Sequence, residues 1–130
     1  MIVETSVLVA IVKRETGYEN YISAIAASED APLMSAANLL EAAIIVDRLG
    51  DRDASRAFSA ITDELEIEIA PFTEEQARIA RTAYTDFGKG TGHKAQLNFG
   101  DCFAYALAKD MRRPLLFKGN DFSETDIAIA

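Results

Sequence analysis

Short apolar runs alternate along the chain with longer segments in which apolar residues recur at helical spacing. Runs of strand length lie at Met1–Val3, Ala31–Met34, Ile67–Ile69 and Pro114–Phe117, and Ile127–Ile129 has the composition of a last short strand. Alternation of such strands with helices is typical of a parallel sheet covered by helices on both faces. The pattern therefore predicts an α/β protein with three layers, α/β/α, around a central, mostly parallel sheet of four to five strands.

Capping signals place the helices between these strands. Thr16 and Thr73 are each followed three residues later by Glu or Gln, which is the spacing of a capping box. Ser35 can cap a strongly apolar helix, expected to be buried almost all round, and Gly50 is suited to end it. We expect a glycine-rich loop at Gly88–Asn98 and helices over Ser6–Lys13, Thr16–Ala27, Ser35–Leu49, Asp53–Leu65, Thr73–Phe87 and Phe99–Lys109.

Length and composition fit one globular domain over residues 1–130. The chain is 49% apolar and 26% charged, so a continuous core is within reach and disorder is not expected. The net charge of −8 argues against a protein that simply coats nucleic acid, because phosphate contacts need a basic surface. It leaves open an enzyme that holds phosphate through bound cations.

Cysteine content and the N-terminus indicate a cellular compartment. Cys102 is the only cysteine, so no disulfide can form within the chain and a reducing setting is expected. The apolar stretch Met1–Val12 contains Glu4 and precedes the first basic residues, whereas a signal peptide has its positive charge first. No run reaches the ~20 apolar residues of a membrane span. We expect a cytoplasmic protein without membrane contact.

Four acidic residues occupy unusual positions. Glu4 ends the first strand, and Glu41 lies in the apolar helix that follows the second. Asp101 opens a helix, and Asp121 follows the strand Pro114–Phe117. Taken singly, each has a structural alternative: a solvated strand end for Glu4, pairing with an arginine for Glu41, helix capping for Asp101 and turn formation for Asp121.

The joint arrangement of these acids favours a metal site. In a parallel sheet, the carboxyl ends of strands and the first turns of the following helices meet at one edge. Four carboxylates converging there repel one another unless cations are bound. Clustered hard oxygen ligands select Mg²⁺ or Mn²⁺. The sequence therefore predicts a divalent-cation site at this edge.

Four blocks of sequence resemble the motifs of VapC-type PIN-domain toxins, in the order of that family and over essentially the whole chain. They are Met1–Ser6, Ser35–Glu41, Leu97–Ala106 and Leu116–Phe122. The resemblance implies a PIN-like fold and a Mg²⁺-dependent endoribonuclease that cleaves structured cellular RNA. It also implies the toxin half of a toxin–antitoxin pair, a homodimer and a VapB-like antitoxin as partner.

The resemblance assigns the catalytic and metal-binding acids as Glu4, Glu41, Asp101 and Asp121. Asn120 or Asp126 could share the role of the fourth acid. The family has Asp where this chain has Glu4, and the extra methylene enters a site whose ion demands near-ideal octahedral geometry. We expect activity to be reduced. The alternative is a catalytically weak or inactive PIN-fold module that still binds its antitoxin.

Other residues have weaker assignments. Thr5 and Ser6 either orient water and metal or cap the first helix. Lys89, His93 and Lys94 either contact RNA phosphate or are solvated loop residues.

One cysteine and one apolar stripe also have structural interpretations. Cys102 is expected to be a small core residue. A stripe on the first two helices is part core and part candidate groove for an antitoxin helix; its members are Leu8, Ile11, Val12, Tyr18, Tyr21 and Ile25.

Two other classes of α/β protein with acidic pockets do not fit. A phospho-receiver domain needs an acid pair after the first strand and an aspartate ending the third strand. Here Glu4 is followed by Thr5 and Ser6, and the strand Ile67–Ile69 ends in Ala-Pro. A haloacid-dehalogenase-type phosphatase needs Asp-x-Asp after the first strand, which is also absent.

Overall fold

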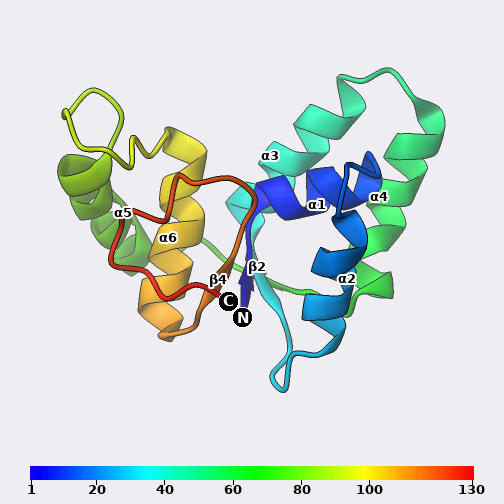
Figure 1. The fold of residues 1–130 in the computed structure, drawn as a ribbon, viewed down its shortest axis with the longest axis horizontal. Helices are drawn as coiled ribbons and strands as arrows, with labels where there is room; N and C mark the ends of the chain where they lie inside the picture. The colour runs from blue at the N-terminus through cyan, green and yellow to red at the C-terminus, as the bar shows by residue number, and fades with distance from the viewer.

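The computed structural model describes residues 1–130, and Figure 1 shows the course of the chain. The elements in chain order are β1 (Ile2–Val3), α1 (Thr5–Val12), α2 (Tyr18–Ala26), β2 (Leu33–Ser35), α3 (Ala36–Asp47), α4 (Arg52–Glu64), β3 (Glu68–Ala70), α5 (Glu74–Phe87), α6 (Phe99–Met111) and β4 (Leu115–Leu116). The four strands form a parallel sheet in the order β3-β2-β1-β4. The predicted α/β fold with a parallel sheet is confirmed.

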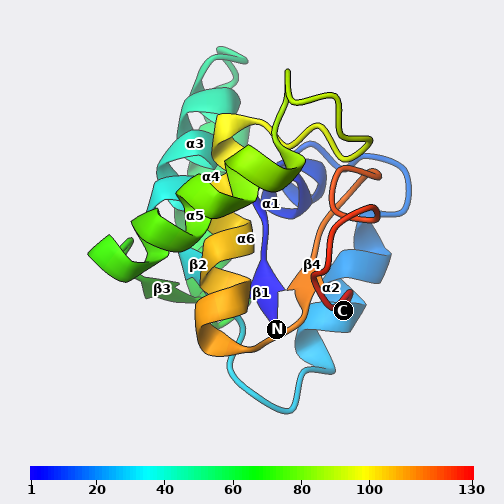
Figure 2. The ribbon, with the colours of Figure 1, turned by 90° about the vertical axis from the view of Figure 1, so that its left-hand side faces the viewer.

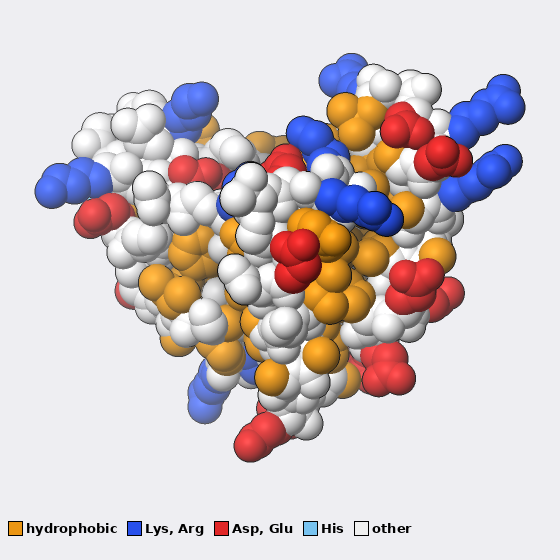
Figure 3. Space-filling view, turned by 45° about the vertical axis from the view of Figure 1, so that its right-hand side comes forward, with side chains coloured by type: hydrophobic (Ala, Val, Ile, Leu, Met, Phe, Trp, Pro, Cys, Tyr) orange, Lys and Arg blue, Asp and Glu red, His pale blue; other side chains and the backbone are white.

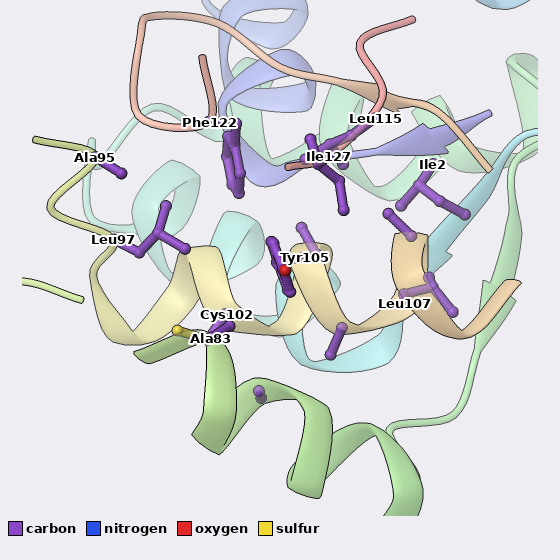
Figure 4. Packing of buried hydrophobic residues seen from close by; sticks show 14 of the residues in the cluster. Ile2, Ala83, Ala95, Leu97, Cys102, Tyr105, Leu107, Leu115, Phe122 and Ile127 are labelled. Carbon is purple, nitrogen blue, oxygen red and sulfur yellow. The ribbon is translucent and has the colours of Figure 1, made fainter. Parts of the chain in front are cut away.

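The sheet separates two hydrophobic clusters, because successive residues of a strand point to opposite faces. Ile2 and Leu115 belong to the cluster formed with α5 and α6, whereas Val3 and Leu116 belong to the cluster formed with α1–α4. Figures 1 and 2 show these two groups of helices on opposite sides of the sheet. Around α6, the C-terminal segment contributes Phe122 and other core residues (Figure 4).

A helix start, a helix cap and a last strand differ from the prediction for local reasons. Helix α2 begins at Tyr18 after Gly17, whose left-handed φ of 82° ends the preceding turn, and Thr16 makes no capping bond. The cap of α1 is the side chain of Glu4, not Thr5 or Ser6. Ile127–Ile129 forms only an isolated bridge, between Leu115 and Ile129.

Helix α3 differs from the prediction of burial on almost all sides. Only Asn38, Ala42 and Val46 are fully buried, because α3 packs on α1, α4 and α6 along one face. Leu40 is 62% exposed and Ile44 is 47% exposed. Apolar side chains also gather in the middle of the face shown in Figure 3, with charged groups around them. Composition alone did not reveal which side of this helix has neighbours.

None of the helices is long and apolar enough to cross a membrane.

Candidate functional site

All four predicted acids line one cleft at the carboxyl edge of the sheet. Its volume is about 360 Å³. The polar side chains that line it are Glu4, Thr5, Ser6, Glu15, Glu41, Asn98, Asp101, Lys118 and Asp121. The edge forms because β1 leads directly into α1, β2 into α3, and β4 into the turn that carries Asp121.

Glu4 is buried beneath the start of α1 and is 5% exposed. Its Oε2 accepts hydrogen bonds from the backbone N of Ser6, at 2.8 Å, and from the Ser6 hydroxyl. The pKa of Glu4 is raised to about 7, mainly by burial; the hydrogen bonds from Ser6 lower it, and the charges of Asp101 and Glu41 contribute to the rise. The side chain thus folds back onto its own helix and holds a proton readily near neutral pH.

Glu41 is held between α1 and α6. Its Oε1 accepts hydrogen bonds from the Thr5 hydroxyl and, at 3.4 Å, from Asn38 Nδ2. The same Asn38 nitrogen donates to the carbonyl of Gly100 at 2.9 Å. A Cβ added at Gly100 would lie 1.8 Å from Glu41 Oε2. Gly100 therefore leaves the space that the carboxylate fills, and no arginine pairs with Glu41.

Asp101 combines a structural role with its place in the cleft. It forms a capping box with Asn98, with N–H···O distances of 2.9 and 2.8 Å. Burial raises the pKa of Asp101 to about 6; the charges of Asp121 and Glu41 raise it too, while the hydrogen bond from the Asn98 backbone lowers it. Capping therefore does not neutralise this acid, which still experiences the charges of two cleft carboxylates.

The cleft offers unused carboxylate oxygens to a cation. Glu4 Oε1, Glu41 Oε2 and Asp101 Oδ1 accept no hydrogen bond, and no ion pair in the structure involves these acids or Asp121. No three acidic, His or Cys side chains lie in a ready-made metal-binding arrangement. Carboxylate oxygens are the ligands that a hard cation prefers. They line one cleft but do not form a closed cage around a single point.

Several residues considered for the site lie elsewhere. Asp126 accepts hydrogen bonds from Tyr105, at 2.6 Å, and Lys109, at 2.7 Å, so its carboxylate is already committed and does not line the cleft. The side chain of Asn120 does not line the cleft either. Of the three residues considered for the fourth position, only Asp121 lines the cleft.

The loop residues considered for RNA contact also lie outside the cleft. His93 accepts a hydrogen bond from Ala95 N at 3.1 Å through Nδ1 and packs edge-on against Phe87. Lys89 and Lys94 are exposed and do not line the cleft. The histidine thus stabilises the loop, and the structure gives these three residues no place at the acids. Cys102 is buried, as predicted.

Sequence reasoning missed Asn38, Gly100 and Lys118. The sequence shows an asparagine in an apolar helix and a glycine within the first turn of a helix, and both were signals. The structure adds that this asparagine is fully buried. Their meaning depends on the approach of α3 to α6, which the sequence does not display. Lys118 follows β4 and is the only cation that lines the cleft.

Comparison with known proteins agrees with this geometry. The model of the PIN domain family matches residues 1–128. Ribonuclease VapC28 of Mycobacterium tuberculosis is 50% identical over 127 residues, covering 98% of this chain and 95% of the relative. Ribonuclease VapC42 of the same species is 42% identical, covering 98% and 96%.

Solved structures share the fold at low sequence identity. VapC20 of M. tuberculosis, described as a toxin that cleaves the sarcin–ricin loop, superposes with a TM-score of 0.78 at 17% identity, covering 99% of this chain and 97% of that one. VapBC2 of Rickettsia felis, bound to a DNA fragment from its promoter, gives 0.76 at 14% identity, covering 99% and 96%. The chain belongs to the PIN-domain family, among the VapC ribonucleases.

Proposed function

We propose that this chain is a Mg²⁺-dependent endoribonuclease and the toxin of a VapB–VapC pair. The observation that carries the proposal is the convergence of Glu4, Glu41, Asp101 and Asp121 in one cleft, in which three carboxylates each keep an unused oxygen. Relatives that match nearly the whole chain are named ribonucleases. Hydrolysis of a phosphodiester is the reaction that such a set of oxygens serves best.

The four acids would hold one or two Mg²⁺ ions, or Mn²⁺ in their place. Bound there, the ion would act as a Lewis acid in the hydrolysis of the phosphodiester. The protein's own part is orientation: Ser6 fixes Glu4, whereas Thr5 and Asn38 fix Glu41. Cation binding would be stronger at higher pH, because a metal competes with protons for the carboxylate oxygens of Glu4 and Asp101, whose pKa values are raised.

Exposed apolar surfaces support a protein partner and a homodimer. An apolar groove of about 440 Å³ lies between α5 and α6, with Phe72, Tyr84, Phe99 and Phe103 in its lining. Phe99 is 77% exposed. Such surfaces are typical of interaction sites, and the structures of similar fold include toxin–antitoxin complexes.

A separate apolar stripe suits the antitoxin. On α1 and α2, Val12, Tyr18 and Tyr21 are half-buried beside the core, which suits a groove for a VapB-like antitoxin helix. We place this pair in the cytoplasm.

The geometry of Glu4 also favours a second candidate function. Because its Oε2 caps α1 through Ser6, Glu4 is drawn toward its own helix. This arrangement supports a weakly active or inactive chain that serves mainly as a binding partner of the antitoxin.

Incubation of the purified chain with total cellular RNA, with Mg²⁺ or with a chelator, tests the proposal. Cleavage products that appear only with Mg²⁺ support the ribonuclease. The Glu4→Asp variant serves as the positive arm, because it restores the residue of the family. Intact RNA with both chains would contradict the assigned activity and leave only the binding role.

A further inference from the structure

One basic side chain stands among the acids of the cleft. The cleft is lined by Glu4, Glu15, Glu41, Asp101 and Asp121, and Lys118 is the only cation among its lining residues. A polyanion that enters this cleft meets five carboxylates. Bound metal offsets part of this charge, and Lys118 is the only protein group there that can offset more of it.

The backbone of Lys118 is joined to the acidic centre. Its N–H donates to Ser6 Oγ at 2.9 Å, and the same Ser6 hydroxyl donates to Glu4. The position of Lys118 is thus fixed relative to Glu4 through one serine side chain. Its side chain extends from this fixed point and is 44% exposed.

The ammonium of Lys118 is occupied by an internal anion. Its Nζ forms an ion pair with Glu15 Oε2, while Lys13 Nζ lies 3.2 Å from Glu15 Oε1. Glu15 is 25% exposed, so both ion pairs face solvent. Ion pairs that face solvent contribute little to stability. A phosphate can therefore replace Glu15 as the partner of Lys118 at small cost, and Lys13 can remain with Glu15.

We propose that Lys118 binds a backbone phosphate of the RNA beside the cleaved bond, and that Glu15 takes the place of this phosphate when RNA is absent. This inference rests on the proposed ribonuclease function. Lys118 would thus bind substrate although the net charge of the chain is −8. Glu15 would compete with the RNA phosphate for the Lys118 ammonium.

The chain offers a matched control in Lys13. Lys13 and Lys118 contact the same carboxylate and carry the same charge, but only Lys118 lines the cleft. Binding of a fluorescein-labelled RNA hairpin is measured by anisotropy in full-length chains that all carry Asp101→Asn, so that the RNA stays intact. The added changes are Lys118→Ala, Lys118→Arg, Lys13→Ala and Glu15→Gln, each titrated at several salt concentrations.

Lys118→Ala is expected to weaken RNA binding five- to tenfold and to lower the salt slope by about one. Lys118→Arg keeps the affinity within about twofold, and Lys13→Ala changes it by less than about twofold. Glu15→Gln strengthens binding, because the competitor of the phosphate is removed. Equal effects of Lys118→Ala and Lys13→Ala, or weaker binding with Glu15→Gln, would overturn the inference. Absence of RNA binding both in this Asp101→Asn background and in the chain with Asp101 intact would instead refute the proposed function, and the inference with it.

Discussion

Asp101 lies in the first turn of α6, and Asp126 is contacted by two residues of the same helix, yet the environments of the two carboxylates are opposite. Asp126 has its partners within the protein: the hydrogen bond from Lys109 lowers its pKa most, and the hydrogen bond from Tyr105 lowers it as well. Asp101 has no basic partner, and burial together with the charges of Asp121 and Glu41 raises its pKa to about 6. A carboxylate with internal partners serves the fold. A buried carboxylate left among other carboxylates is available to bind a proton or a cation.

Exchange of each aspartate for asparagine gives the largest expected contrast. Asp101→Asn is expected to lower Mg²⁺-dependent RNA cleavage at least about 100-fold, because a ligand of the ion is lost. Asp126→Asn should leave cleavage within about twofold and cost about 0.5–1.5 kcal/mol of unfolding free energy through its bonds to Tyr105 and Lys109. Cleavage rates and urea denaturation measure the two effects. Similar loss of cleavage in both variants would remove the distinction.

Gly100→Ala tests the close approach of α3 and α6. The new Cβ would lie 1.8 Å from Glu41 Oε2, so the carboxylate has to move. Because displacements near 1 Å cost on the order of 100-fold in rate, we expect cleavage to fall by about that factor. Gly90→Ala is the control for the added methyl group, since Gly90 has open space around its Cβ position; its positive φ of 88° adds backbone strain that Gly100→Ala does not. Full cleavage by Gly100→Ala would show that Glu41 is not needed where it lies.

Glu4→Asp tests whether the longer side chain impairs the cleft. The shorter carboxylate changes the reach from the end of β1 at constant charge, so any change in rate reports geometry. We expect at least about a tenfold gain in RNA cleavage, equivalent to roughly 1.4 kcal/mol of barrier. Expression without antitoxin should also become harmful to the host. Equal cleavage by the two chains at saturating Mg²⁺ would show that Glu4 is an adequate ligand.

The pH dependence of melting gives a smaller effect of defined sign. The folded pKa of Glu4 is about 7 and that of Asp101 about 6, both raised above their ordinary values. Their contribution to stability is therefore present at low pH and is lost as pH rises through about 6–7. If Mn²⁺ binds these carboxylates once they have lost their protons, it should raise the melting temperature more at pH 8 than at pH 5. A Mn²⁺ effect that is equal at both pH values would contradict this linkage.

Much of this arrangement could be predicted because it follows from local rules. Glu4 ends a strand, and Glu41 and Asp101 lie near the starts of helices, so a parallel sheet brings them to one edge. The contact of Glu41 with Gly100 and the bridge through Asn38 depend on the spacing between α3 and α6. The residue pattern of neither helix predicts how far apart α3 and α6 lie.

Side-chain competition explains the remaining differences. Glu4 rather than a hydroxyl residue caps α1, because its longer side chain reaches Ser6 N while remaining in the cleft. The commitment of Asp126 to Lys109 and Tyr105 depends on the path of the last turn. Local propensity does not decide these partners, since Ser and Thr are the usual N-cap residues and Glu is not; the tertiary placement of each side chain does.

Calorimetric titration of the full chain with Mn²⁺ at pH 8 tests most directly whether the acids of the cleft hold a divalent cation. Saturable binding is predicted for the chain as it stands and for Asp126→Asn, with at least tenfold weaker binding for Asp101→Asn. The titration reports the site whether or not Glu4 permits cleavage. Absence of saturable heat, or equal binding by the Asp101→Asn and Asp126→Asn variants, would contradict the assignment of these carboxylates as metal ligands.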